Sequence, residues 1–169
     1  MAILAGDIKF YYSGSGTTAN PELSIGGAIS ANEVGGTLEQ LFDTVTGAES
    51  TAGMSDYRGI YVRNEHASLA LSSIAMFIQT NDTDSEISIA KGDEAINTSL
   101  ETTTENVAPT GPSFTAPSTY GTGIAIPDLT GNGAAGDYQG IWIRRTVAPG
   151  NSAESGSTAT LRVQGDTPA

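Results

Sequence analysis

The sequence predicts an all-β protein, built as a single β-sandwich or jelly-roll-like domain with an extended N-terminal segment and long loops. Three observations favour this class. A segment rich in strand-forming residues occurs twice, short apolar runs alternate with turn residues, and only 15% of the residues are charged. Glycine, serine, threonine and alanine take the place of charge, as is typical of β-proteins whose surfaces carry hydroxyl groups.

The repeated segment reads Asp-Tyr-x-Gly-Ile-aromatic-β-branched-Arg. It covers residues 56–63 and returns at residues 137–144, which is 81 positions later (137 minus 56). Side chains alternate across a strand, so one face carries matching residues in both copies. These are Tyr57, Gly59, Tyr61 and Arg63, and then Tyr138, Gly140, Trp142 and Arg144. We therefore expect strands 56–64 and 137–145 at equivalent positions in a pseudo-symmetric sandwich, the alternative being chance convergence of two buried strands.

The remaining elements follow from apolar periodicity and turn residues. Further strands are predicted at residues 8–12, 68–72, 74–79, 85–90, 123–126 and 158–163. Thr37 offers an N-cap for a short helix ahead of Leu38, Leu41, Phe42 and Val45, whereas loops are expected at 26–36, 47–55 and 107–118. Residues 1–36 would form an N-terminal strand or arm with a glycine-rich connector, and residues 37–169 the sandwich, in one globular domain.

Composition excludes several classes of function. Nineteen acidic against seven basic residues give a net charge of −12, and a phosphate-binding face needs a basic patch that is missing here. The absence of cysteine excludes disulfides and thiolate zinc sites. We see no secretory pattern and no run approaching the roughly eighteen apolar residues of a membrane span. The sequence thus predicts a protein made in the cytoplasm, with no cofactor and no nucleic-acid or membrane partner.

One segment resembles the opening of a calcium-binding loop. Asp128, Thr130 and Asn132 place oxygen atoms at alternate positions before Gly133. The twelfth position is Gln139, inside a predicted strand, where calcium loops have a bidentate glutamate. A plain turn is therefore favoured, and no metal site is predicted.

No catalytic set emerges from the remaining residues. His66 is the only histidine, and alone it builds neither a catalytic triad nor a typical zinc site, so we expect a solvated turn residue. The alternating carboxylates at positions 82, 84 and 86 fit a charged hairpin tip. The chain is predicted not to be an enzyme, and a calcium-dependent hydrolase fragment is the weakest alternative.

The repeated aromatic residues allow two interpretations. Tyr57, Tyr61, Tyr138 and Trp142 could line a sugar-binding platform, but their matching places in two central strands favour core or subunit-interface positions. Arg63 and Arg144 occupy the same place in each copy, and we expect both to pair with carboxylates, within the subunit or across an interface.

These segments together resemble a known group of proteins. Leu41-Phe42-Asp43, Gly47-Ala48-Glu49, the first repeat through Asn64, and Ile141-Trp142-Ile143-Arg144-Arg145-Thr146 look like small structural proteins of tailed bacteriophages. The similarity covers residues 23–165 and is greatest with the cement or decoration subunits of the head. It implies a non-enzymatic β-sandwich on the head surface of the virion that binds the major capsid protein where capsomers meet.

The resemblance also implies assembly. Members of the group are often trimers, so we expect a homo-oligomer, with a trimer favoured. Residues 1–12 and the loops 13–36 and 106–120 are expected to contact other chains, because an apolar N-terminal segment can serve as an arm that orders on a partner. A carbohydrate-binding adhesin, or a tail or fibre sandwich module of a phage, is the alternative function.

Overall fold

A computed structural model describes residues 2–35, 40–151 and 158–167. The strands in this part of the chain are β1 (Ile8–Gly14), β2 (Ala28–Glu33), β3 (Met54–Asn64), β4 (Ser72–Thr80), β5 (Ser85–Lys91), β6 (Ile124–Ile126), β7 (Tyr138–Val147) and β8 (Thr160–Asp166). The helical elements are α1 (Gly47–Ala52) and the 3-10 turns η1 (Ala5–Asp7), η2 (Pro21–Leu23) and η3 (Tyr120–Thr122). The predicted all-β class is therefore confirmed.

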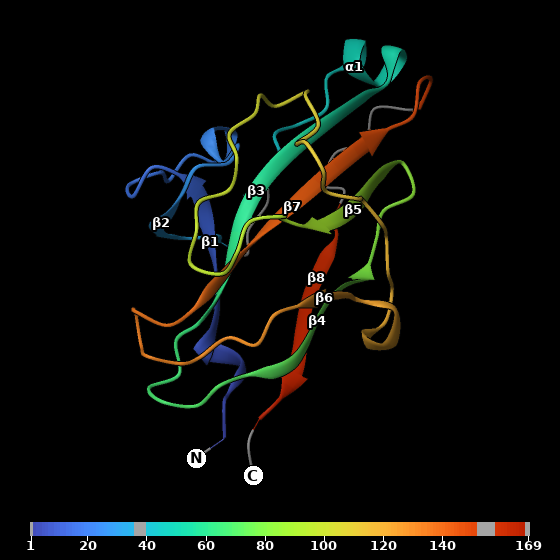
Figure 1. The fold of residues 1–169 in the computed structure, drawn as a ribbon. Helices are drawn as coiled ribbons and strands as arrows, with labels where there is room; N and C mark the ends of the chain where they lie inside the picture. Colours follow the sequence, from blue (N-terminus) through green and yellow to red (C-terminus); the bar gives the residue numbers. More distant parts are fainter. Residues whose placement is uncertain (1, 36–39, 152–157, 168–169) are drawn as a thin grey trace.

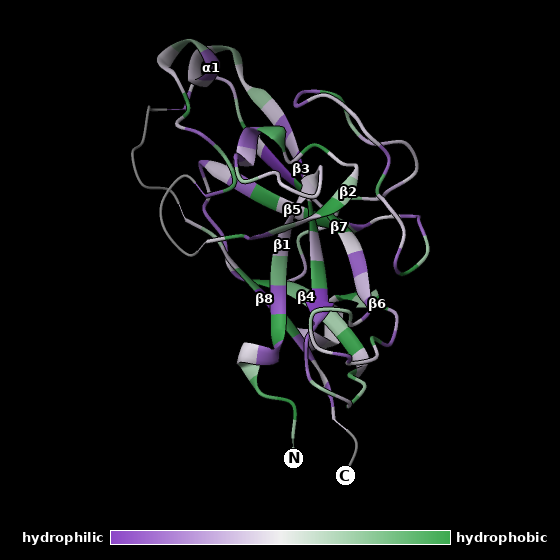
Figure 2. Ribbon diagram, turned by 90° about the vertical axis from the view of Figure 1, so that its left-hand side faces the viewer, coloured by the Kyte–Doolittle hydropathy of each residue, from purple (hydrophilic) through white to green (hydrophobic). Residues whose placement is uncertain are grey.

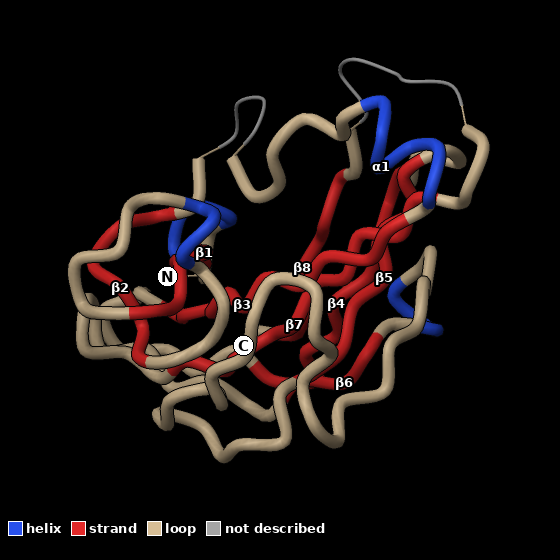
Figure 3. The backbone as a smooth tube through the Cα atoms, turned by 90° about the horizontal axis from the view of Figure 1, so that it is seen from above, coloured by secondary structure: helices blue, strands red, loops and turns tan. Residues whose placement is uncertain are grey.

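The strands form two antiparallel sheets that pack as a sandwich (Figure 1). The larger sheet has the order β2-β1-β3-β7-β5, and the smaller one has the order β6-β4-β8. Seen from above in Figure 3, strands occupy the middle of the molecule, long loops surround them, and α1 lies at one end. The long connection between β5 and β6, residues 92–123, runs back over the larger sheet, because Thr115 bridges to Ile89 and Leu100 bridges to Gly27.

The two copies of the repeat are direct neighbours. β3 and β7 pair antiparallel with Ile60 opposite Ile141, and these are equivalent residues of the two copies. A local two-fold axis through this pair converts each copy into the other, so the aromatic residue next to the axis in each copy faces the glycine of the other copy. Gly59 lies opposite Trp142, and Tyr61 lies opposite Gly140.

The pseudo-symmetry extends to the flanking strands. β1 pairs with the outer edge of β3, and β5 pairs with the outer edge of β7. The registers also correspond, since Tyr12 lies opposite Ile60 and Lys91 lies opposite Ile141. The expectation of equivalent strands thus holds within one four-stranded unit of a single sheet.

One hydrophobic core fills the space between the two sheets. Its buried side chains are Ile60, Val62, Leu71, Ile74, Met76, Ile78, Ile87, Ile89, Ile126, Leu129, Ile141 and Ile143. Ile60, Val62, Ile141 and Ile143 come from the repeat face opposite the aromatic residues, as strand alternation requires. Burial of so much apolar surface is the main stabilising term of the sandwich.

A second core lies on the opposite face of the larger sheet, beneath the 92–123 connection. It contains Tyr11, Tyr57, Tyr61, Ala90, Leu100 and Trp142. Leu100 comes from the connection and is 3% exposed, and it occupies the space above the two repeat glycines. A methyl group at Gly140 would lie 2.5 Å from Leu100 Cδ2, and one at Gly59 would lie 3.0 Å from Leu100 Cδ1. The repeat needs glycine at both places because one leucine plugs both.

Several local expectations require correction. The helix begins after Thr46, where we expected a loop. Thr46 accepts a hydrogen bond from Glu49 N while Glu49 accepts one from Thr46 N, which forms a capping box. Residues 40–45 are not helical, and residues 37–39 of the expected helix lie outside the described part of the chain.

The N-terminal region is more fully integrated than an arm would be. β1 lies inside the larger sheet, and β2, expected as part of a loose connector, is its edge strand. Residues 8–33 therefore contribute two strands to the sandwich. The segment before Ile8 is also attached to it, because Ile3 packs against the main core and the Asp7 carbonyl accepts a hydrogen bond from Glu65 N. The expected strand at 68–72 is reduced to a bridge between Leu71 and Leu129 ahead of β4.

No helix in the described ranges is long and apolar enough to cross a membrane.

Replacement of Gly140 by alanine tests the plugged-glycine arrangement. The new methyl group would collide with Leu100, so we expect the free energy of unfolding to fall by about 1–3 kcal/mol through overpacking. Denaturant unfolding measures the effect. Gly121→Ala is the matched control, because no heavy atom lies within 4 Å of a methyl group at that position. Equal stabilities of the two variants would contradict the proposed packing.

Candidate functional site

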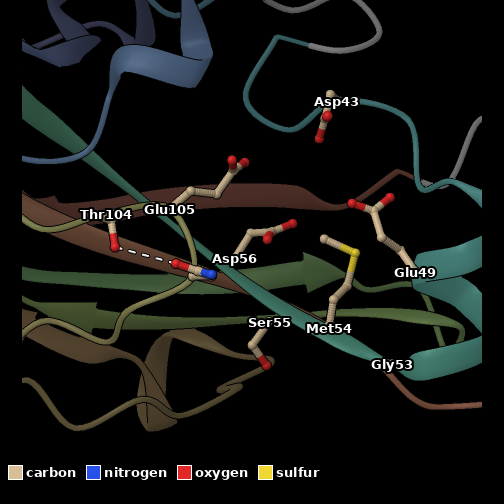
Figure 4. A pocket seen from close by; sticks show the side chains of 9 residues that line it. Asp43, Glu49, Gly53, Met54, Ser55, Asp56, Thr104 and Glu105 are labelled. Carbon is tan, nitrogen blue, oxygen red and sulfur yellow. Dashed lines mark hydrogen bonds between the residues drawn. The ribbon is translucent and has the colours of Figure 1, made fainter.

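An open acidic pocket of about 570 Å³ lies near α1, at one end of the larger sheet (Figure 4). Its lining residues are Asp43, Glu49, Gly53, Met54, Ser55, Asp56, Thr104, Glu105 and Asn106. They come from three segments: the connector before α1, the start of β3 with the helix that precedes it, and the 92–123 connection. The pocket therefore forms only when the long connections have docked on the sheet.

Three carboxylates come together in this pocket. Asp43, Asp56 and Glu105 each offer an oxygen atom, and these atoms lie within 4.8 Å of one another. Asp56 is buried on β3, whereas Asp43 is exposed in the connector. Clustered carboxylates at this spacing could hold a cation of the size of calcium.

Arg145 already serves as the counter-charge of two of these carboxylates. It lies on β7 directly opposite Asp56, and its Nη2 atom is 2.6 Å from Asp56 Oδ2 and 3.1 Å from Asp43 Oδ1. It also donates to the Asp43 carbonyl oxygen. Both Arg145 and Asp56 are buried, where an unpaired charge would be costly. The pair is stable there because each charged group lies against an opposite charge.

Arg58 performs the same task for the third carboxylate. Its side chain is fully buried, forms an ion pair with Glu105, and donates from Nε to the Leu41 carbonyl oxygen at 3.0 Å. The Phe42 ring lies close to both guanidinium groups, 5.3 Å from Arg58 and 4.8 Å from Arg145. These cation–π contacts join the two arginines into one network. The network fixes the connector 41–43 against the sheet.

The electrostatics of the pocket follow from burial. Desolvation raises the pKa of the Asp56 carboxyl, and hydrogen bonding with the Arg145 guanidinium offsets this only in part. At the rim, hydrogen bonds from Thr46 lower the pKa of Glu49. With two arginines already engaged, the arrangement acts chemically as a structural charge network, and a metal ion would have to displace an arginine to gain these ligands.

The repeat aromatics lie in the second core. Tyr57, Tyr61 and Trp142 are 8%, 0% and 0% exposed, and Tyr138 is half-buried with its ring at 5.3 Å from Tyr61. Tyr61 donates to the Gly27 carbonyl oxygen and accepts from Leu100 N at 2.7 Å. Trp142 Nε1 has no hydrogen-bond partner among the described residues, so its indole contributes packing alone. Of the two predicted locations for these aromatic residues, the core and a subunit interface, the structure places them in the core.

The two repeat arginines differ. Arg63 lies 3.7 Å from the Glu65 carboxylate and stacks near Tyr11 and Tyr138, as the expected carboxylate pairing requires. Arg144 instead donates to Ser88 Oγ at 2.9 Å and lies over the Phe114 ring. No ion pair of Arg144 with a carboxylate is recorded among the described residues.

The calcium candidates are used in turn geometry. Asp128 Oδ1 accepts from Ser73 N at 3.2 Å, and the Asp137 carboxylate accepts from Thr130 N and from Asn97. Asn132 and Thr130 lie in the tight turns of residues 130–136, where Ala135 N donates to the Asn132 carbonyl and Asp137 N donates to the Thr130 carbonyl. These contacts support the plain-turn interpretation of Asp128, Thr130 and Asn132.

His66 was expected to be solvated, and this is wrong. The residue is 9% exposed, and its Nδ1 atom accepts hydrogen bonds from Ser68 N and Leu69 N. These two hydrogen bonds make His66 a fixed part of the turn after β3.

Sequence reasoning missed the network of Arg58 and Arg145. The signal was present, because alternation puts each arginine on the isoleucine-rich face of its strand, where an unpaired charge is costly. Two of the carboxylates that pair with them, Asp43 and Glu105, lie in loops distant in sequence, and hydrophobic periodicity does not indicate such contacts.

Comparisons with protein-family models, with curated proteins and with solved structures found no match, so the functional argument rests on the geometry of this chain.

Replacement of Arg145 by methionine tests the charge network. Asp56 would remain buried without its cation, and we expect a loss of about 3–5 kcal/mol in the free energy of unfolding at neutral pH. Because the pKa of Asp56 is already raised, the loss shrinks as the pH falls and the carboxyl becomes protonated. Lys9→Met is the control, since the ion pair of Lys9 with Glu33 is exposed to solvent and such pairs contribute little to stability. A loss independent of pH would contradict the role assigned to Asp56.

Alkaline titration tests the burial of the tyrosines. Desolvation raises the pKa values of Tyr11 and Tyr61 to about 12, from about 10 in an unfolded chain. Since the folded-state values are the higher ones, this contribution to stability is complete below pH 10 and disappears towards pH 12. Desolvation also raises the pKa of Tyr12, so tyrosinate absorbance should show three of the six tyrosines ionising late. Ionisation of all six near pH 10, with native circular dichroism, would contradict this assignment.

Proposed function

We propose that the protein is a non-enzymatic structural subunit of a tailed-bacteriophage virion, seated on the outer head shell as a cement or decoration protein that contacts the major capsid protein. The observation that carries the proposal is the position of the exposed apolar side chains. The large exposed hydrophobic residues of the described chain are Leu4, Leu23 and Val107, which are 69%, 59% and 53% exposed. One falls in each of the three segments expected to contact other chains.

The segments that carry these side chains lie at opposite ends of the molecule. In Figure 1, the N-terminal segment with Leu4 leaves the sandwich at the end near the close of β8, whereas η2 and the loop before residue 107 lie at the other end. Figure 2 shows the N-terminal segment as an apolar strip beyond η1. A subunit with an apolar contact at each end can hold two different neighbours, which is the task of a cement protein.

The charge network supports the same proposal. Arg58, Arg145 and the three carboxylates tie the connector 41–43 and the 92–123 connection to the larger sheet, so the long loops have a defined shape. A rigid loop surface loses little conformational entropy on docking. Such loops suit a subunit that binds many copies of one shell lattice.

The alternative adhesin function fits less well. A carbohydrate platform of the usual kind presents aromatic rings on an exposed face, but Tyr57, Tyr61 and Trp142 are buried beneath Leu100 and Phe114. A sugar site would have to use other residues. The proposal for the head surface therefore takes precedence.

Localisation in purified virions is the primary experiment. Labelling or imaging should find hundreds of copies distributed over the head shell. A few copies confined to the tail tip, together with glycan binding by the isolated protein, would replace the proposal with the adhesin alternative.

Substitution of the exposed apolar residues tests the contact surface. We expect Leu4→Asp and Val107→Asp each to weaken binding to head shells stripped of the protein by about tenfold or more, because a buried charge replaces an apolar contact. Co-sedimentation with the shells measures binding. Ala67→Asp, exposed in the turn after β3 and outside the three segments, is the matched control.

A deletion complements these substitutions and must stop before β1. Removal of residues 2–4 spares the strand that pairs with β2 and β3, whereas removal through residue 12 would cut into the larger sheet. If the shortened protein and both aspartate variants bind shells as well as the control, these segments are not the contact surface.

A further inference from the structure

The two sheets have four edge strands, and three of them are protected. At β5, Ile89 exchanges backbone hydrogen bonds with Thr115, and the Asn81 side chain bonds both backbone groups of Ile87. At β2, Ala31 N donates to the Gly16 carbonyl, and the Asn32 and Ser30 side chains bond the Thr18 carbonyl. β6 has only three residues. Short or covered edges of this kind prevent pairing with other chains.

β8 is the exception. It has seven residues, forms the outer strand of the smaller sheet (red in Figure 1), and pairs with β4 on one side only. Within the described ranges, no backbone hydrogen bond reaches its other edge. A regular, unpaired edge is a template for a further strand.

The ladder with β4 determines which groups of β8 remain free. Ile78 N donates to the Pro117 carbonyl on the β6 side, so alternation turns Ala75 and Phe77 towards β8. Their partners are Gln164 and Arg162. The backbone groups of the odd-numbered residues, Leu161, Val163 and Gly165, therefore face outward.

The side chains of β8 are complementary to a second copy of the same strand. Its exposed positions are Thr160, Arg162, Gln164 and Asp166. If two copies pair antiparallel about Gln164, Arg162 of each strand lies opposite Asp166 of the other. With the odd-numbered groups making the hydrogen bonds, these are non-hydrogen-bonded pairs, in which opposed side chains approach most closely.

The lack of a partner for the Arg162 side chain within its own subunit supports this register. The other six basic residues, Lys9, Arg58, Arg63, Lys91, Arg144 and Arg145, all contact an acidic, carbonyl or hydroxyl group. Among the described residues, neither the Arg162 guanidinium nor the Asp166 carboxylate has a partner. The two side chains are four residues apart on the same strand, which is too far for them to pair with each other. In a two-fold symmetric interface, Arg162 of each copy can pair with Asp166 of the other, so the ion pair forms twice.

We propose that two copies of this chain associate through antiparallel pairing of their β8 edges, centred on Gln164, so that the two smaller sheets become one continuous sheet. The interface is isologous, with Arg162 of each copy paired with Asp166 of the other. This inference does not depend on the proposed function, and it predicts a dimer where the family resemblance implies a trimer.

Sedimentation equilibrium of the intact protein tests the proposal, together with a charge exchange. The parent protein should be a dimer. Arg162→Asp and Asp166→Arg should each weaken dimerisation about tenfold or more, because like charges then face each other twice. The double variant R162D/D166R should restore the parent dissociation constant. Glu86→Arg, exposed on the protected β5 edge, changes the net charge as Asp166→Arg does and should leave the dimer intact.

A backbone variant keeps the test independent of side-chain charge. Val163→Pro removes an outward N–H group of β8 and none of the N–H groups directed at β4, so native circular dichroism should persist while the dimer is lost. A parent protein that is monomeric or trimeric, or a double variant that stays as weak as the single ones, would overturn the proposal. Dimer retention in Val163→Pro with native spectra would overturn it equally.

Discussion

The antiparallel pairing of β3 with β7 is the constraint on which the rest of the fold depends. The pair is central in the larger sheet and both of its faces are apolar, so both must be covered. The smaller sheet covers the isoleucine face. The aromatic face needs a separate cover, and the 92–123 connection supplies it through Leu100 and Phe114. A long loop thereby becomes part of the core, which explains why so much non-repetitive chain has a defined course.

Tyr61 links this cover to the edge of the sheet. Its hydroxyl group contacts Gly27 and Leu100 together, so the same side chain positions the strand edge and the plug. Ser24 extends the contact, since its carbonyl accepts from Gly59 N at 2.7 Å and its hydroxyl donates to the Gly59 carbonyl. Buried polar groups that are fully bonded in this way specify one arrangement of the chain.

The network of Arg58, Arg145 and their carboxylates also specifies one arrangement of the chain, at the other end of the β3–β7 pair. Buried ion pairs add little net stability, because desolvation of the charges cancels much of their attraction. Their effect is on specificity: Arg58 and Arg145 accept only a connector that brings a carbonyl, a carboxylate and the Phe42 ring to the right places. The acidic pocket is the solvent-facing side of that network.

The sequence was sufficient to predict the fold class, seven of the eight strands of the described chain, and the faces of the repeat. Those features depend on alternation and turn residues, which are local. β2 was hidden because alanine, serine and asparagine are weak strand formers, and its position comes from pairing with β1. The capping box of Thr46 and Glu49 was readable but was outweighed by the apolar spacing after Thr37. Neither the adjacency of the two repeats nor the partners of Arg58, Arg145 and His66 could be read, because each is a contact between distant segments.

The distribution of charge determines how copies of this protein meet. Six of the seven basic residues are engaged within the subunit, so the outer surface is dominated by carboxylates and two copies repel each other at long range. An attractive contact must then be short-ranged and local, as the exposed apolar side chains and the Arg162–Asp166 arrangement are. Salt has two opposing effects on association, because screening over about 8–10 Å weakens both the repulsion between copies and the attraction of exposed ion pairs. Apolar contacts and backbone hydrogen bonds are largely spared, so association through edges and apolar residues gains on balance as ionic strength rises.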